Sequence, residues 1–394
     1  MLFRSIYTQF DRFEKLSGFV RSRVGLEAAV SLSALRGLEK GKQIALVGMV
    51  AEKRRSSTGT IRIDLEDPTG SKATLIVPKN NRELLAKAER VILDEVIGVI
   101  GSVASSGNSV FVRDIPWPSL PYQRERRRAE QPFAAVMISD LHIGSEQFLE
   151  EVFDRFIRWL RGDEGEEHER ALAGQVKYVI VAGDVVDGIG VYPEQKSELL
   201  IHDIYKQYEV AAELLSSLPD YIEVIIAPGN HDAARPSEPQ PAISEDIAKP
   251  LYDRGFKMVG NPCLLSLEGV YFLVYHGRSF DDLVPAVPGL SRLNPTKPMI
   301  ELLERRHLAP IYGGRTAISP ESEDFMVIDE IPDVFHCGHV HRFGATEHKG
   351  IMVVNSATFQ AKTQYMQKLG IDPTPGYVPV FNLKTHELEV KEFA

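Results

Sequence analysis

The chain has 394 residues, and its 43% hydrophobic and 25% charged shares are ordinary for a soluble globular protein of two or three domains. Its formal net charge of −10 argues against a protein that holds nucleic acid through a broad basic surface. It contains no run of eighteen apolar residues, no signal-peptide pattern and only two cysteines, so we expect a cytoplasmic protein without a membrane partner.

The first forty residues are interpreted as an N-terminal helical arm. Apolar residues between Phe10 and Val20 recur at helical spacing, and residues 26–39 are expected to form a further short helix. We expect the arm, residues 1–40, to serve packing or partner docking and to carry no chemistry.

Residues 41–119 have the pattern of a small β domain. Three stretches alternate apolar and polar residues and are separated by turn residues: QIALVGMVAEKR, TIRIDLEDPTG and SKATLIVP. A helical stretch, NRELLAKAERVI, precedes two further strands, EVIGVIGSVA and NSVFVRDI. Three strands, a helix and two strands are the order of a five-stranded OB barrel. The strands carry few exposed aromatics, which favours docking of another protein over direct binding of single-stranded nucleic acid.

A proline-rich linker, residues 120–132, follows the barrel. It contains a basic cluster from Arg124 to Arg128. Such a run is usually a solvated face, and steering of phosphates is the alternative.

Residues 133–394 are expected to form an α/β domain, because apolar strands alternate there with helical patterns. The proline-rich segment 285–332 is interpreted as a surface insertion over or beside the site. The alternating segments after residue 343 are expected to close a second sheet. The predicted helices of this domain cover residues 150–161, 197–217, 242–254 and 298–306.

Five short motifs in this domain each follow a short apolar run, and such runs are typical of buried strands. In open α/β sheets, ligands bind just outside the carboxyl ends of the strands, so the motifs are predicted to meet at one rim. The motifs are SDLHIGS from Ser139, GDVVDG from Gly183, GNHD from Gly229, Tyr275-His276-Gly277, and GHVH from Gly338.

These motifs predict a site for two divalent cations. His and carboxylate ligands without thiolate suit manganese, which we expect first, with iron, zinc and magnesium as alternatives. Two residues apart on an extended backbone, Asp140 and His142 point to the same side and can reach one ion. Asp184, with two oxygens, is the natural bridge between two ions. The predicted ligands are Asp140, His142, Asp184, Asn230, His276, His339 and His341.

Such an ion pair can activate water and clamp a phosphate in line with it. His231 follows the predicted ligand Asn230 and is placed to donate a proton to the leaving oxygen. Asp232 is expected to orient the His231 ring, as outer carboxylates commonly do. For Asp187, contact with the outer part of the site and a turn cap are both open.

The motifs resemble those of the calcineurin-like metallophosphoesterases over residues 133 to about 360. With the OB domain directly before them, three stretches narrow the resemblance: MIELLERRHLAPIYGG, IPDVFHCGHVHRFG and VNSATFQAKTQYMQKLGIDPTPGYVPV. Together these features resemble the small subunits of the archaeal D-family DNA polymerases over nearly the whole chain.

The resemblance implies a sandwich of two mixed sheets flanked by helices, rather than the single open sheet that the strand pattern suggests. It also implies a proofreading 3′–5′ exonuclease that acts on a DNA 3′ end beside a separate large polymerising subunit. The family's metal ligands map onto the seven residues above, and its catalytic histidine maps onto His231. Many members carry a longer N-terminal region than the forty residues here, so a sliding clamp has no support as a partner.

Two alternatives remain. The chain could be a structural polymerase subunit with an idle metal site, which the complete ligand set argues against. It could also be a stand-alone phosphodiesterase or repair nuclease without a polymerase partner.

Overall fold

The computed structural model describes residues 2–104, 108–121 and 124–394, and its contacts divide the chain into two compact units. Unit 1 comprises Met1–Pro121, Ser279–Leu290 and Ile300–Glu330, and unit 2 comprises Tyr122–Arg278, Ser291–Met299 and Ile331–Ala394. Most of the segment interpreted above as a surface insertion therefore packs within unit 1. Residues 105–107 and the predicted linker residues 122–123 lie outside the described residues.

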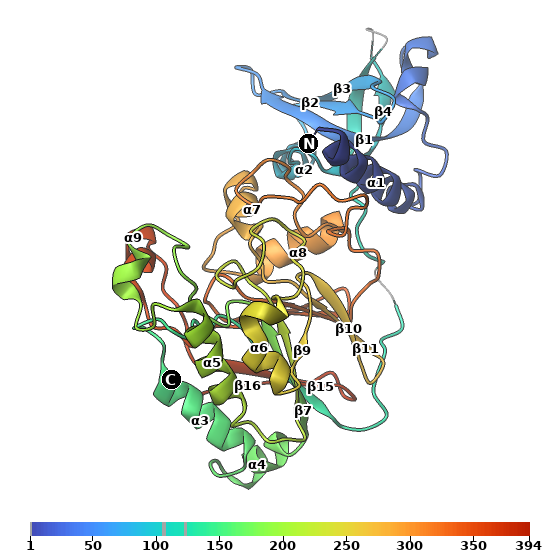
Figure 1. Ribbon diagram of the computed structural model, residues 1–394. Coiled ribbons are helices and arrows are strands. Elements are labelled where there is room, and N and C mark those ends of the chain that lie inside the picture. The colour runs from blue at the N-terminus through green and yellow to red at the C-terminus, as the bar shows by residue number, and fades with distance from the viewer. Residues whose placement is uncertain (1, 105–107, 122–123) are drawn as a thin grey trace. The chain divides into compact units, whose positions relative to one another are not determined.

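Unit 1 contains the predicted five-stranded barrel, which is closed in the order β1-β2-β3-β5-β4 (Figure 1). The β3–β5 pair is parallel and the other pairs are antiparallel. Alternate residues point into one buried apolar core, as the sequence pattern predicts. The elements are β1 (Gln43–Arg55), β2 (Ile61–Glu66), β3 (Lys72–Val77), α2 (Arg82–Arg90), β4 (Val96–Val103) and β5 (Ser109–Asp114).

The helical spacing in the first part of the N-terminal arm is borne out by helix α1 (Leu2–Arg21), which packs on the barrel through Leu16 and Val20. The second predicted helix is wrong in length. Only η1 (Leu32–Gly37) forms, as a 3-10 helix. Its buried residues, Leu32 and Leu35, are three apart, which matches three residues per turn and offers no longer apolar stripe to an α-helix.

Unit 2 contains two sheets. One has six strands in the order β16-β15-β6-β7-β8-β9, and the other has five in the order β10-β11-β12-β14-β13. The strands are β6 (Ala134–Ile138), β7 (Val176–Ala182), β8 (Glu223–Ala227), β9 (Lys257–Met258), β10 (Cys263–Leu267), β11 (Val270–Val274), β12 (Val334–Cys337), β13 (Gly344–His348), β14 (Ile351–Asn355), β15 (Tyr377–Asn382) and β16 (Leu388–Glu392).

The two sheets face each other across a shared apolar core, in which Phe272 of β11 meets Phe381 of β15 with ring centroids 5.9 Å apart. This arrangement confirms the sandwich and makes the single open sheet wrong. The last two strands also differ from expectation. β15 pairs with β6 in the six-stranded sheet, because its alternate residues fill the same core, so only β13 and β14 close the second sheet.

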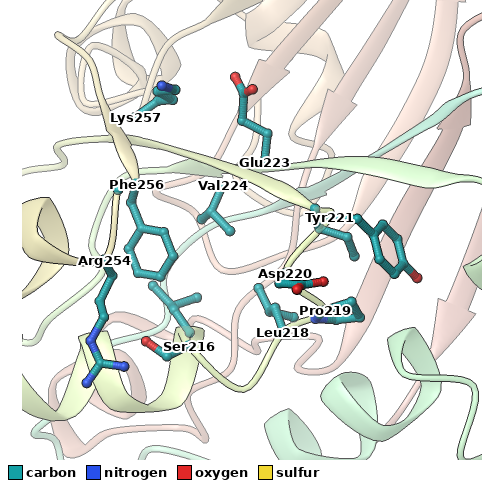
Figure 2. A pocket seen from close by; sticks show the side chains of 13 residues that line it. Ser216, Leu218, Pro219, Asp220, Tyr221, Glu223, Val224, Arg254, Phe256 and Lys257 are labelled. Carbon is teal, nitrogen blue, oxygen red and sulfur yellow. The ribbon is translucent and has the colours of Figure 1, made fainter.

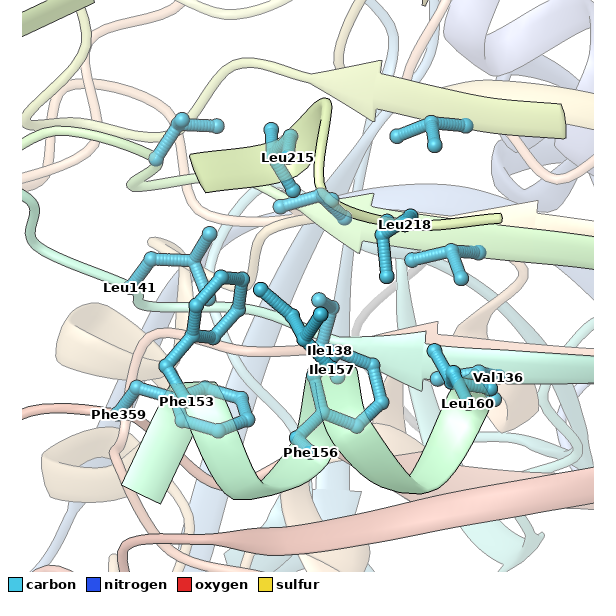
Figure 3. Close-up of a cluster of buried hydrophobic side chains, with 14 of the residues drawn as sticks. Val136, Ile138, Leu141, Phe153, Phe156, Ile157, Leu160, Leu215, Leu218 and Phe359 are labelled. Carbon is cyan, nitrogen blue, oxygen red and sulfur yellow. The ribbon is translucent and has the colours of Figure 1, made fainter. Parts of the chain in front are cut away.

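Helices cover the outer face of the six-stranded sheet (Figure 1). Figure 3 shows Phe153, Phe156 and Leu160 of α3 packing toward Val136 and Ile138 of β6. None of the described helices is long and apolar enough to cross a membrane. The later helices are α3 (Glu150–Leu160), α4 (Glu167–Ala173), α5 (Ile204–Leu215), α6 (Glu245–Asp253), α7 (Phe280–Ala286), α8 (Thr296–Arg305) and α9 (Gln364–Leu369), with a 3-10 turn, η2, at Gln195–Glu198.

The predicted helix at 197–217 begins later, because Asp203 caps α5 by accepting a hydrogen bond from the backbone N–H of Lys206.

The basic cluster after the barrel also differs from a solvated face. Arg124 and Arg127 both pair with the buried carboxylate of Asp333, at 2.8 and 3.4 Å. These arginines hold the start of unit 2 in place.

Candidate metal centre

The five motifs lie where five strands of unit 2 end, at the carboxyl ends of β6, β7, β8, β11 and β12. Backbone hydrogen bonds join the following loops to one another. The N–H of Asp140 donates to Gly183, that of His142 donates to Asp184, and that of Gly338 donates to His276. The two sheets therefore bring the predicted residues to one place, as expected from the strand pattern.

Among the described residues, ligand atoms form three overlapping groups, and the atoms of each group lie within 4.8 Å of one another: first Asp140, His142 and His341, second Asp140, Asp184 and His276, and third His142, Asp187 and His231. In the first, His341 Nε2 lies 3.2 Å from Asp140 Oδ1 and 3.0 Å from His142 Nε2. In the second, His276 Nε2 lies 3.2 Å from Asp184 Oδ2 and 3.0 Å from Asn230 Oδ1.

Asp184 stands between the first and second groups, since the same Oδ2 is also 3.8 Å from His142 Nε2. This position suits the bridging role expected for it. His339 is placed beside the second group: its ring centroid is 5.1 Å from that of His276, and its backbone N–H donates to the Asp140 carboxylate. All seven predicted ligands thus gather around one centre.

Their backbone conformation differs from the one that we assumed. Asp140 and His142 have φ of 53° and 52°, and His339 and His341 have φ of 72° and 54°. These are left-handed values, so each pair lies in a tight turn beyond its strand and not on an extended backbone. Asp184 shares this feature, with φ of 53°. Left-handed residues other than glycine cost free energy and cluster at functional sites, where the surroundings hold them.

The second group has too many acceptors to be stable without a positive charge. His276 Nδ1 lies 2.8 Å from the backbone oxygen of Ala182, which can only accept, so Nδ1 carries the hydrogen. The neutral ring then directs the Nε2 lone pair at the oxygens of Asp184 and Asn230. Three converging lone pairs need a cation or an added proton between them.

Asp187 supports the first group. Its Oδ1 lies 2.9 Å from His142 Nδ1, and both side chains are buried. Because a carboxylate accepts, Nδ1 carries a hydrogen, and Nε2 is the nitrogen that faces Asp140 and His341 and would bind an ion. From the sequence, two roles were open for Asp187: contact with the outer part of the site, or capping of a turn. Its place three residues after Asp184, in the same Gly-Asp motif, was the available signal.

The electrostatics of the centre favour positive charge among the ligands. Burial alone would lower the pKa of His142, but hydrogen bonds with Asp140 and Asp187 and the charge of Asp184 raise it to about 10. His276 is buried as well, and Asp184 raises its pKa to about 9. The buried carboxyl of Asp184 in turn has its pKa held far below the usual value by these imidazoles. The carboxylates thus draw protons onto the histidines, and bound cations would take the place of those protons.

His231 lies beside the first group, with its ring 4.6 Å from that of His142 and its side chain 14% exposed. Asp232 does not orient this ring. Among the described contacts, its carboxylate accepts from the backbone N–H of Gly229 at 2.8 Å and from the hydroxyl of Tyr208 at 3.2 Å. Asp187 takes the expected place, because its backbone oxygen lies 2.7 Å from His231 Nδ1.

Glycine is required where the loops approach the ligands most closely. A Cβ at Gly229 would collide with the carboxylate of Asp184, and one at Gly338 would collide with that of Asp140. At both positions the absent side chain leaves room for a carboxylate that belongs to the centre.

Comparison with known proteins matches the chain to polymerase subunits. A family model that describes the B subunits of DNA polymerases alpha and epsilon matches residues 135–345, a stretch that contains all seven predicted ligands. The DNA polymerase II small subunit of Methanothermobacter thermautotrophicus is 45% identical over 94% of this chain and 76% of its own length. That of Archaeoglobus fulgidus is 44% identical over 94% and 73%. That of Methanocaldococcus jannaschii is 42% identical over 96% and 64%.

Proposed function

Because the chain belongs to the family of archaeal D-family DNA polymerase small subunits, we propose that its candidate metal centre is a proofreading 3′–5′ exonuclease site. The substrate is a DNA 3′ end, and the reaction is hydrolysis of its terminal phosphodiester to release a nucleoside monophosphate. The observation that carries this proposal is the pair of ligand groups joined at Asp184.

The donor set fits two divalent cations, with manganese as the first expectation. When bound, such ions would activate water and neutralise charge on the phosphate. Asp140, His142 and His341 would hold one ion, and Asn230, His276 and His339 the other, with Asp184 shared. Imidazole nitrogens with carboxylate and amide oxygens are a ligand set that manganese, iron, zinc and magnesium can use to different degrees.

His231 is assigned to the departing 3′ oxygen. Its Nδ1 faces the backbone oxygen of Asp187 and therefore keeps its hydrogen, which leaves Nε2 for the substrate. When the ring carries a second hydrogen on Nε2, that N–H would donate to the departing 3′ oxygen, which takes the proton as the P–O bond breaks and leaves the ring neutral. Asp187 links metal binding to the departure of the 3′ oxygen, since it orients the proposed ligand His142 through its side chain and His231 through its backbone.

The large catalytic subunit of the polymerase is the proposed partner. With a net charge of −10, the chain offers little attraction to the DNA backbone at long range. We therefore expect weak DNA binding by the isolated chain and faster hydrolysis in the assembled enzyme, where the large subunit holds the DNA.

The test is digestion of single strands labelled at either end by the full chain and by its assembly with the large subunit. With manganese, a 3′ label should leave at once as a mononucleotide, while a 5′ label should remain on a shortening ladder. A chelator or Asp184→Ala should lower the rate at least a hundredfold. Equal degradation by Asp184→Ala would support a structural subunit with an idle site, and early release of the 5′ label would overturn the proposed direction.

A further inference from the structure

A pair of stacked tyrosines lies beside the candidate metal centre. The rings of Tyr192 and Tyr365 are 4.9 Å apart between centroids and only 25° from parallel. Tyr192 is also 6.1 Å from the ring of His231. The pair is formed by two distant segments of unit 2: the loop after the GDVVDG motif and helix α9 (Figure 1).

The two segments are held together and to the centre. The Tyr192 hydroxyl donates to Glu198 at 3.1 Å, and Lys368 of α9 pairs with Glu194 of the loop at 3.3 Å. Gln195 donates to the backbone oxygen of Asp187 at 2.7 Å and to its carboxylate at 2.9 Å. The same residue that orients His142 and His231 therefore also positions the loop that carries Tyr192.

Tyr365 remains open to solvent although it is stacked. Its exposed fraction is 43%, and Ile189 and Val191 of the same loop as Tyr192 are exposed at 47% and 36%. Tyr365 is thus a partly exposed aromatic ring, stacked on a second ring that lies beside His231. It offers a flat surface of the kind on which nucleobases stack.

We propose that Tyr365, backed by Tyr192, is a stacking platform for the base of an unpaired 3′-terminal nucleotide. This inference rests on the proposed exonuclease function and adds its substrate class. Stacking is tolerant of sequence because every base has an aromatic face, which suits an enzyme that must remove any nucleotide. It also supplies binding that does not depend on positive charge, which a chain with net charge −10 lacks.

The platform favours frayed or mismatched ends. A base paired within a duplex must lose its pairing and its stacking on the neighbouring base to reach Tyr365. An unpaired terminal base gives up less free energy when it moves there. Discrimination between single-stranded and paired 3′ ends is therefore expected to depend partly on this ring.

The surface pocket shown in Figure 2 provides a matched control residue. It lies at the starts of β8 and β9, the opposite ends of these strands from the metal centre, and Tyr221 lines it with an exposed fraction of 57%. Tyr221→Ala removes a tyrosine of similar exposure from the same unit without touching the platform.

The first experiment compares Tyr365→Ala, Tyr365→Phe and Tyr221→Ala in the full chain with manganese. Tyr365→Ala should raise KM for a single strand about tenfold. It should lower the preference for single-stranded over paired ends and leave hydrolysis of bis-p-nitrophenyl phosphate, which has no base, unchanged. Tyr365→Phe and Tyr221→Ala should behave as the unmodified chain. An unchanged KM in Tyr365→Ala, or an equal loss on the base-free ester, would overturn the proposal.

The second experiment measures stacking without cleavage. In a His231→Ala background, a single strand with 2-aminopurine at its 3′ end should lose fluorescence on binding, and Tyr365→Ala should abolish that quenching. Quenching that survives Tyr365→Ala, or its absence before that change, would overturn the platform. If the unmodified chain hydrolyses neither substrate, the exonuclease proposal fails, while this measurement still decides the platform.

Discussion

His142 and Asp187 form a buried pair in which Nδ1 of the imidazole lies 2.9 Å from Oδ1 of the carboxylate. The pair fixes the nitrogen that His142 turns toward Asp140 and His341. It also makes Asp187 a residue on which the geometry of the first ligand group depends, although no ion is expected to contact it.

We expect Asp187→Asn to weaken manganese binding by 10–100-fold, because the amide no longer fixes the tautomer of His142 as a carboxylate does. Titration calorimetry of the full chain measures this directly. Asp203→Asn, which changes an exposed helix cap, serves as the control. Unchanged affinity in Asp187→Asn would mean that His142 keeps its orientation without this partner.

His231→Ala should separate chemistry from metal binding. Loss of a positioned proton donor is expected to slow hydrolysis by about 10²–10⁴-fold, while manganese affinity changes little because the seven proposed ligands remain. Single-turnover digestion and calorimetry give the two values. A parallel loss of metal affinity would place His231 among the ligands instead.

Gly229→Ala tests the close approach to Asp184. The added methyl group must displace the Asp184 carboxylate, and overpacking of this kind typically costs about 1–3 kcal/mol, so metal affinity should fall at least fivefold. Gly174→Ala is the matched control, since that residue has φ of −65° and its nearest contact to a new Cβ is 3.5 Å. Equal affinity in both variants would contradict the packing argument.

Asp232→Asn should destabilise unit 2 rather than act on the histidine beside it. The buried carboxylate accepts hydrogen bonds from the backbone N–H of Gly229 and the hydroxyl of Tyr208. In asparagine one of the two acceptor oxygens is replaced by an NH2 group, which cannot accept either hydrogen bond. We expect the free energy of unfolding to fall by about 1–3 kcal/mol, measured by urea denaturation. Tyr208→Phe, which removes one hydroxyl, should cost less.

Unit 1 should lose stability in mild acid because of His307. Its Nδ1 accepts from the backbone N–H of Ala309 and its Nε2 faces Asp324 at 3.0 Å, so the folded ring is neutral. Burial and nearby Arg12 lower its pKa to about 4, against about 6.5 in the unfolded chain. The folded state therefore binds this proton less tightly than the unfolded state does, and the contribution is complete above pH 6.5 and lost as the pH falls toward 4.

The predicted loss is at most about 3 kcal/mol between these limits. Urea denaturation at pH 7 and at pH 4.5 should show it in the unmodified chain. In His307→Gln, where an amide can accept from Ala309 and donate to Asp324 without titrating, the pH dependence should be smaller. Identical pH dependence in the two proteins would remove His307 as the cause.

The sequence predicted the barrel and the five strands before the motifs because both depend on local patterns. Alternation of apolar residues determines which strand face is buried, and short apolar runs end where their motifs begin. The order of elements along the chain, which is three strands, a helix and two strands, identified the barrel as an OB fold. The sandwich came only from resemblance to a family, since hydrophobic periodicity does not say which sheet a strand joins.

The sequence by itself determined which residue types were available at the candidate centre: seven potential ligands and His231, each after a predicted strand. Only the tertiary structure decided how they meet. It placed Asp140, His142, Asp184, His339 and His341 in left-handed turns, gave Asp187 the role expected of Asp232, and brought Tyr365 to Tyr192. The physical reason is that hydrogen-bond partners and ring contacts between distant segments depend on the packing of both sheets, and no local pattern in the chain encodes them.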